Sequence, residues 1–302
     1  MSILHRVVRW LRSESRHGRR HERWARWLGK SWAKVSYGFR IEPTWLELNR
    51  LNITIPGLPD AFAGFRIAHL SDFHCGKRIS SSYLHEAVDL AQAQQADLVV
   101  LTGDFIHNGY KYIDQVAGIV GKLSAPHGVY AVLGNHDHSV RNALGLRRFR
   151  HLHRAVAHGL SRQGIQVLHN ETVPLTRGEH TVHLVGVEDL WSRACDLNRA
   201  FSSQSTSVPC ITLAHNPRTV ERLAGRRCDL MLSGHTHGGQ VNWSRLGVPA
   251  RARKHQRMIA GLYQYQRTLV YVNKGIGYGF QFRFGVRPEV AIFTLHPPGT
   301  PA

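Results

Sequence analysis

The sequence predicts an α/β domain over residues 48–298, preceded by a basic helical arm over residues 1–40. Short apolar runs alternate with stretches of helical periodicity from about residue 48 onward, which is typical of α/β folds. The polar groups that could carry chemistry directly follow apolar runs, and ligands in such folds collect beyond the C-terminal ends of the strands. The positive charge, by contrast, is concentrated at the start of the chain.

Residues 1–40 have the composition of a basic amphipathic arm. They hold 11 Lys/Arg against Glu14 and Glu22, and they contain four of the seven tryptophans: Trp10, Trp24, Trp27 and Trp32. Apolar and basic residues recur at helical spacing, a pattern that suits the headgroup region of an anionic bilayer. Membrane-surface binding is therefore the first interpretation. A helix pair packed on the domain and a nucleic-acid-binding arm with stacked aromatic rings are the alternatives.

The bulk sequence excludes several other classes. No run of 18 apolar residues occurs, so no transmembrane helix is expected. Charged residues interrupt the segment behind Arg19-Arg20, so neither a secretory nor a twin-arginine signal is expected. The four cysteines are widely separated and include no CxxC pair, which indicates reduced thiols in a cytosolic protein.

The first half of the domain predicts a strand–loop–helix succession. Helices are expected over residues 80–95 and 112–123. Strands are expected over residues 51–55, 66–70, 97–101 and 129–133. The last three strands end at Asp72-Phe73-His74, at Gly103-Asp104 and at Gly134-Asn135-His136-Asp137.

The second half predicts one long helix and shorter strands. An Arg/His-rich helix is expected over residues 141–163, with an inner stripe of Leu146, Phe149, Leu152, Val156 and Leu160. Strands are expected over residues 166–169, 171–175, 181–187, 210–214, 229–233, 268–273 and 288–295. His215 closes the fourth of these strands, and Gly234-His235-Thr236-His237 follows the fifth.

The five polar groups together supply the ligands for two divalent cations. A lone histidine at a strand end is more often structural than a ligand, but the joint pattern reverses that reading. Hard divalent ions prefer carboxylate and water, while imidazole suits borderline ions such as Mn, Fe and Zn. The candidate metal ligands are Asp72, His74, Asp104, Asn135, His215, His235 and His237.

Asp104 is the candidate bridge between the two ions, since Gly103 gives its backbone room at the strand end. A carboxylate can hold two ions about 3.5–4 Å apart, and such a pair activates water for in-line attack at phosphorus. His136 fits the role of general acid or phosphate clamp. Asp137 is expected to orient it by accepting a hydrogen bond from its other ring nitrogen.

At these residues the sequence resembles the calcineurin-like metallophosphoesterases, whose pattern is DxH…GD…GNHD/E…H…GHxH. The match spans about residues 65–296. The resemblance implies a four-layer αββα sandwich, two metal ions and catalysis by His136. It implies that one ion is held by Asp72, His74, Asp104 and His237, and the other by Asp104, Asn135, His215 and His235.

A finer resemblance is to small bacterial phosphodiesterases of this superfamily, including UDP-2,3-diacylglucosamine pyrophosphatases of lipid A biosynthesis. The segments that carry it are His215-Asn216-Pro217, residues 234–240 and the tail from Tyr271 through Arg283 to Glu289. It implies a manganese-dependent hydrolase of a nucleotide-linked lipid, cytoplasmic and peripheral to the inner membrane.

The alternatives are a soluble phosphodiesterase acting on nucleotides or nucleic acid, and a non-catalytic scaffold of the same fold. The presence of every expected ligand argues against the scaffold. Arg283, Lys77 and the 245–257 loop are the candidates for gripping the substrate.

Overall fold

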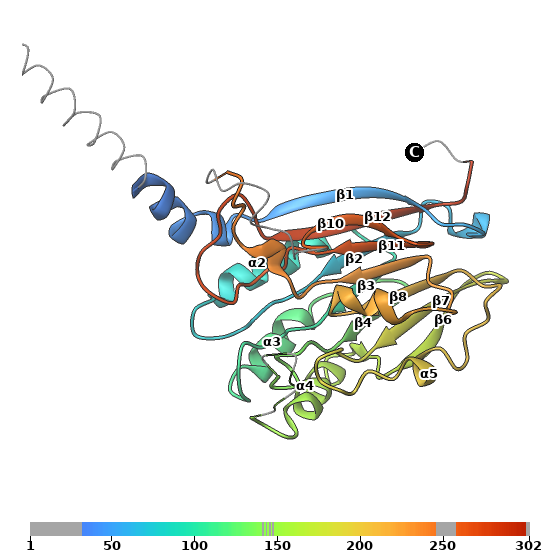
Figure 1. The fold of residues 1–302 in the computed structure, drawn as a ribbon, viewed down its shortest axis with the longest axis horizontal. Helices are drawn as coiled ribbons and strands as arrows, with labels where there is room; N and C mark the ends of the chain where they lie inside the picture. The colour runs from blue at the N-terminus through green and yellow to red at the C-terminus, as the bar shows by residue number, and fades with distance from the viewer. Residues whose placement is uncertain are drawn as a thin grey trace, which may run out of the picture.

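A computed structural model describes residues 32–140, 142, 144, 146, 148–245 and 258–299. Two six-stranded sheets lie face to face, and helices cover the outer face of each (Figure 1). Of the predicted arm, residues 32–40 are helical, and its remainder lies outside the described residues. Among the helices that the structure describes, none has both the length and the apolarity needed to cross a bilayer.

The first sheet carries the strands that begin the domain. Its order is β1 (Glu47–Thr54), β12 (Glu289–His296), β2 (Arg66–Leu70), β3 (Leu98–Thr102), β4 (Val129–Val132) and β5 (Gln166–Val167). β2, β3, β4 and β5 run parallel, whereas β12 runs antiparallel to β2. The three strands β2 to β4 are buried almost throughout because both faces of the sheet are covered, which explains their continuous apolar sequences.

The second sheet carries most of the later strands. Its order is β10 (Gly261–Tyr265), β11 (Thr268–Val272), β9 (Leu230–Ser233), β8 (Cys210–Ala214), β7 (His180–Val187) and β6 (Glu171–Arg177). The strands β7, β8, β9 and β11 run parallel. The C-terminal ends of β8 and β9 therefore meet at one edge of this sheet.

Alternate residues of β3 pack into different cores, as the two-residue period of a strand requires. Val99 and Leu101 face the helices, while Leu98 and Val100 face the second sheet, where they meet residues such as Leu213. The core between the sheets is thus built from one face of each, and the outer cores from the opposite faces.

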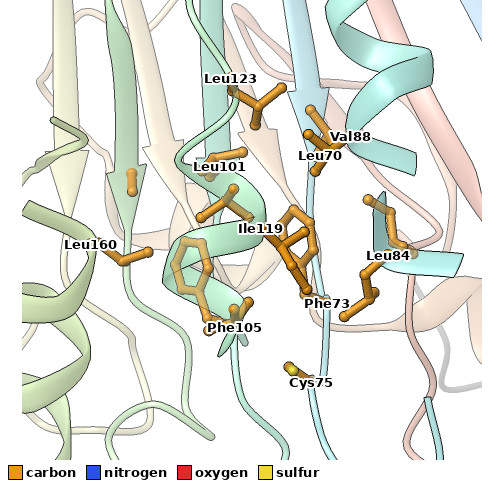
Figure 2. Packing of buried hydrophobic residues seen from close by; sticks show 14 of the residues in the cluster. Leu70, Phe73, Cys75, Leu84, Val88, Leu101, Phe105, Ile119, Leu123 and Leu160 are labelled. Carbon is orange, nitrogen blue, oxygen red and sulfur yellow. The ribbon is translucent and has the colours of Figure 1, made fainter. Parts of the chain in front are cut away.

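The first outer layer consists of α2 (Ser81–Gln92), α3 (Ile113–Val120) and α4 (Leu152–Ser161). The hydroxyl of Ser80 caps α2 by accepting from the Tyr83 amide at 3.3 Å. Figure 2 shows Leu84 and Val88 of α2 and Ile119 of α3 around Phe73 and Phe105, which come from the loops after β2 and β3. The two phenyl rings stack with centroids 5.8 Å apart.

The second outer layer is thin. It contains α5 (Leu197–Ala200) and the 3-10 helix η3 (Pro217–Arg222), which pack on β6, β7, β9 and β11. With this layer the molecule is the expected four-layer αββα sandwich.

The structure differs from the sequence prediction in one helix and in one strand that was not predicted. The helix predicted over 141–163 is wrong in its first half, because α4 begins at Leu152 and the described residues before it form bends and turns. Leu146, which the helical stripe placed inward, is 72% exposed. The sequence analysis also missed β10, an edge strand whose side chains are half-buried or exposed and so lack an apolar run.

The core between the sheets should dominate stability. Leu213 is completely buried there, so Leu213→Ala should lower the free energy of unfolding by about 2–5 kcal/mol. Leu262→Ala on the edge strand β10, where the side chain is 43% exposed, should change it by no more than about 0.5 kcal/mol. Denaturant unfolding of both variants measures the difference, and equal losses would contradict this account of the core.

Candidate metal centre

The predicted ligands come together at one edge of the sandwich, in loops that follow five strands. Asp72 and His74 follow β2, Asp104 follows β3, and Asn135 follows β4 in the first sheet. The remaining ligands follow strands of the second sheet: His215 after β8, and His235 and His237 after β9. The candidate site is therefore assembled from both sheets.

The first group of donor atoms lies around His74. Its Nε2 is 2.9 Å from Nε2 of His237, 3.4 Å from Oδ2 of Asp104 and 3.9 Å from Oδ1 of Asp72. The same Asp72 oxygen is 3.5 Å from the His237 nitrogen. These four side chains are the set that the resemblance assigns to one ion.

The second group lies around His215. Its Nε2 is 3.2 Å from Nδ1 of His235 and 3.2 Å from Oδ1 of Asn135. The latter two atoms are 2.9 Å apart. Oδ2 of Asp104 is 3.3 Å from the His215 nitrogen. These are the four side chains assigned to the other ion.

Asp104 Oδ2 belongs to both groups, at 3.4 Å from a nitrogen of one and 3.3 Å from a nitrogen of the other. This is the position that a bridging carboxylate oxygen requires. Donor atoms bound in adjacent positions at about 2.1 Å from a cation lie about 3 Å apart, and most of the separations above are close to that value. The donor set therefore fits two divalent ions.

Hydrogen bonds around the site orient the ligand atoms. His215 donates from Nδ1 to the Thr102 carbonyl at 2.6 Å, so its Nε2 faces the second group. The nearby carboxylates, Asp104 above all, raise the pKa of His215, so a cation that binds at Nε2 would displace a proton. Oδ2 of Asp72 accepts from the Ser71 hydroxyl at 2.6 Å and from the His235 amide at 3.0 Å. Its Oδ1 is thereby directed toward the first group.

Burial and charge set the protonation states needed for binding. Burial lowers the pKa of His235 to about 3 and holds the pKa values of His74 and His237 below the usual value for histidine. Those imidazoles are neutral and can donate lone pairs. Burial alone would raise the pKa of Asp104, but the neighbouring imidazoles of His215 and His136 hold it well below its usual value, so the carboxyl group stays anionic.

The ligand loops adopt an unusual backbone. Five ligands have positive φ angles between 45° and 72°, a region that costs about 1–3 kcal/mol for a side chain to occupy: Asp72, His74, Asp104, His235 and His237. Phe73 and Phe105, between and beside these ligands, insert into the helix-covered core and anchor the loops (Figure 2).

Two glycines of the motifs leave space for ligand carboxylates. A Cβ at Gly134 would overlap Oδ1 of Asp104, and a Cβ at Gly234 would overlap Oδ2 of Asp72 and the hydroxyl of Ser71. Each glycine is therefore required by a ligand from a different loop.

The predicted hydrogen bond between Asp137 and His136 is wrong. His136 donates from Nδ1 to the His107 carbonyl at 2.8 Å. Asp137 instead accepts from the amides of Phe105 at 3.0 Å and Gly134 at 2.9 Å, and it thereby ties the loops after β3 and β4 together. The carboxylate directly after the candidate catalytic histidine suggested a side-chain pair, but the turn directs it toward backbone amides.

Two residues near the site were missed by the sequence analysis. The Nδ1 of His107 is 3.4 Å from Nδ1 of His74, so its ring contacts a ligand while its carbonyl holds His136. The ring of Trp191 meets the His235 ring edge-on, with centroids 4.4 Å apart. His107 lies in the loop after β3 and Trp191 in the loop after β7. Their position after the C-terminal end of a strand is the feature that could have identified them as site residues.

The candidates for gripping the substrate have different outcomes. Arg283 is completely buried, and its guanidinium donates to the carbonyls of Lys274, Gly275 and Gly277, so its predicted contact with substrate is wrong. It stabilises the loop behind the site. Lys77 is exposed in the loop after β2, and residues 246–257 lie outside the described residues.

Comparison with known families agrees with this geometry. The model of the calcineurin-like phosphoesterase family matches residues 65–239, which is more than half of the chain. The chain belongs to the calcineurin-like phosphoesterase family. Its sequence is 31% identical to the phosphodiesterase YaeI of Escherichia coli over 260 residues, which cover 86% of this chain and 92% of that relative.

Two further relatives of this family are similar over most of their length. The uncharacterized metallophosphoesterase YkuE of Bacillus subtilis is 30% identical, covering 86% of this chain and 89% of the relative. The UDP-2,3-diacylglucosamine pyrophosphatase LpxG of Chlamydia muridarum is 28% identical, covering 83% and 90%. The protein is a metal-dependent phosphohydrolase.

Two bound ions would supply a metal-activated water and neutralise charge on the phosphoryl group. The protein's own residues hold and orient the reacting groups. Nδ1 of His136 donates to the His107 carbonyl, and this hydrogen bond fixes the orientation of the ring beside the donor groups. Asp104 stays unprotonated and joins the two groups of donors.

Metal content should separate the ligand groups. Because Asp104 belongs to both, Asp104→Asn should lose both ions, whereas His235→Ala and His237→Ala should each weaken binding of one. Mass spectrometry of the purified proteins counts the ions, with the exposed His180→Ala as the control that keeps both. Full occupancy in Asp104→Asn would contradict the bridging role.

Removing His136 should affect turnover without affecting the metals, because no donor atom of either group belongs to it. His136→Ala should keep both ions and lower kcat by about 10²–10⁴-fold. Metal content and hydrolysis of a chromogenic diester are measured on the same sample. A loss of metal that parallels the loss of turnover would instead make His136 a ligand.

Proposed function

We propose that this protein hydrolyses a phosphodiester or pyrophosphate bond of a nucleotide-linked lipid such as UDP-2,3-diacylglucosamine at a membrane surface. The two groups of donors that share Asp104 support the hydrolytic mechanism. The similarity to LpxG proteins over about 90% of their length supports the substrate class.

The proposed cofactor is a pair of manganese ions, with iron or zinc as the alternatives. Carboxylate and amide oxygens provide the donors that harder ions prefer, whereas the four imidazoles favour borderline ions. The proposed ligands are Asp72, His74, Asp104, Asn135, His215, His235 and His237. In this proposal His136 is the general acid.

The proposed location is the cytoplasmic face of the inner membrane. The basic, tryptophan-rich residues 1–40 would bring the protein to the anionic leaflet in which a lipid substrate lies. Each Lys or Arg close to such a surface contributes about 1 kcal/mol.

A second candidate function is hydrolysis of soluble nucleotides or nucleic acid. The similarity to the phosphodiesterase YaeI favours it, because that relative's name specifies no lipid substrate. In that case the arm would bind phosphate backbones, and binding would fall steeply with salt. The complete set of ligands leaves no support for the non-catalytic scaffold.

Manganese-dependent release of UMP from UDP-2,3-diacylglucosamine tests the proposal. The full-length protein should release UMP, and the His136→Ala control should lose most of that activity. Metal-dependent cleavage of a chromogenic diester without any UMP release would reject the lipid substrate and favour the second candidate.

Deleting residues 1–31 tests the arm while sparing the docked helix that follows. Turnover of a soluble diester should be unchanged, because the metal centre lies in the folded domain. Turnover of a lipid substrate in anionic vesicles should fall at least about tenfold, since many basic residues are lost. Equal losses on both substrates would indicate a structural role for the arm.

A further inference from the structure

Large exposed apolar side chains gather at one end of the described molecule. Seven of the eleven such residues lie in residues 32–45, in the turn after β9 and in the loop before β12. We call this group the aromatic face: Trp32, Val35, Phe39, Ile41, Trp45, Trp243 and Phe280. Their exposed fractions range from 43% to 74%, so each presents much of its side chain to solvent.

The segments that carry the aromatic face are held together by direct contacts. The ring of Phe39 packs on that of Phe282 with centroids 4.8 Å apart, and the Arg283 amide donates to the Gly38 carbonyl at 2.9 Å. Tyr37 meets the rings of Trp45 and Phe284 edge-on, at 6.5 and 6.2 Å. The face is therefore part of the folded domain.

Cations surround this face, whereas exposed carboxylates are absent from its described segments. Lys34, Arg40 and Arg245 are exposed, and the Arg287 guanidinium lies 4.0 Å from the centre of the Trp45 ring. The carboxylate of Glu42 is buried and accepts from the Val286 amide. The exposed charges on these segments are therefore positive.

A polar cavity of about 640 Å³ opens between these segments. Trp45 and Trp243 line it together with Arg245, Arg287 and the glycines that directly follow His237. Two carboxylates also line it: that of Glu42 accepts from the Val286 amide, and that of Glu47 pairs with Lys274. Indole rings beside guanidinium groups are the combination found where proteins meet lipid headgroups.

The aromatic face is also fixed relative to the metal centre. Gln240, three residues after the ligand His237, donates from its side chain to the carbonyls of Phe280 and Phe282, each at 2.8 Å. Its own carbonyl accepts from the Phe284 amide at 2.9 Å. In Figure 1 the blue helix of residues 32–40 lies at the same end of the sandwich as the loops that follow β2 and β3.

We propose that the aromatic face lies on an anionic lipid bilayer and holds the metal centre at the level of the headgroups. Its apolar area suits insertion into the interface, and its cations suit an anionic leaflet. The tryptophan-rich, basic residues 1–31 precede it directly in the chain and extend the same composition. Access of a lipid substrate to the metal centre from the bilayer rests on the proposed function, whereas binding of the protein to the bilayer does not.

Vesicle binding by full-length variants tests the proposal. The double variant Trp243→Ser/Phe280→Ser should lower the partition coefficient on phosphatidylcholine vesicles containing phosphatidylglycerol by at least about tenfold. Leu146→Ser, which removes a more exposed apolar side chain outside the face, should not. Thermal unfolding and metal content verify that each variant is folded. Partition equal to that of the wild type in the double variant would overturn the proposal.

Two substitutions that each remove one positive charge test whether the face prefers anionic lipids. Arg245→Gln should weaken binding to vesicles with phosphatidylglycerol but not to neutral ones. Arg267→Gln, in the turn between β10 and β11 at the opposite end of these strands, should change neither. Equal effects of the two substitutions would show that only net charge matters, and that would contradict a specific docking face.

A fluorescent label locates the contact directly. Phe280→Cys with an environment-sensitive dye should shift to the blue on vesicles, and Arg267→Cys should not. The native thiols should compete little, because burial raises the pKa of Cys75 and of Cys195 to about 11. An unshifted label at position 280 would overturn the proposal. Self-association in place of vesicle binding would also overturn it and would assign this face to a second copy of the chain.

The outcome is separable from that of the proposed function. Vesicle binding through this face without UMP release would reject the lipid substrate alone. UMP release by a protein whose double variant binds vesicles normally would reject the docking face alone.

Discussion

One carboxylate oxygen organises the metal centre. Oδ2 of Asp104 lies within 3.4 Å of His74 and 3.3 Å of His215, so the two groups of donors are joined through it. A fully buried anion is costly unless positive charge compensates for it. Imidazoles provide part of that compensation, and two cations would provide the rest. The glycines before the ligands, the positive φ angles and the buried phenyl rings all help to bring the ligand loops together around this oxygen.

The predictable part of the structure depends on strong local patterns. The strands β2 and β8 have the predicted bounds because they are continuous buried apolar runs, and their ends located the ligand loops. The helical spacing of Leu146, which is exposed, wrongly extended the predicted helix before α4, and the edge strand β10 had no buried run to indicate it. Helical spacing of apolar residues indicates which side chains could be buried on one face. Tertiary packing determines which of them are in fact buried.

Within the site, the ligands were predictable and their supports were not. A motif specifies side chains that must meet at a cation, so the residues could be named from their types and order. Hydrogen bonds to the backbone leave no such signature: Asp137 binds amides of Phe105 and Gly134, and Arg283 binds carbonyls of its own loop. The carbonyl of His107 could belong to any residue type. Such contacts depend on the path of the chain rather than on residue identity.

The ligands come from both sheets, so metal binding would also affect the stability of the sandwich. Apolar side chains hold the sheets together along their shared faces, but at the edge where the ligands meet, polar donors replace that packing. A cation bound there would cross-link two halves of the sandwich that are distant in the chain. Its binding energy would add to the stability of the folded state, because the unfolded chain has no such site. The ligands that would prepare the enzyme for hydrolysis would therefore also join its two sheets.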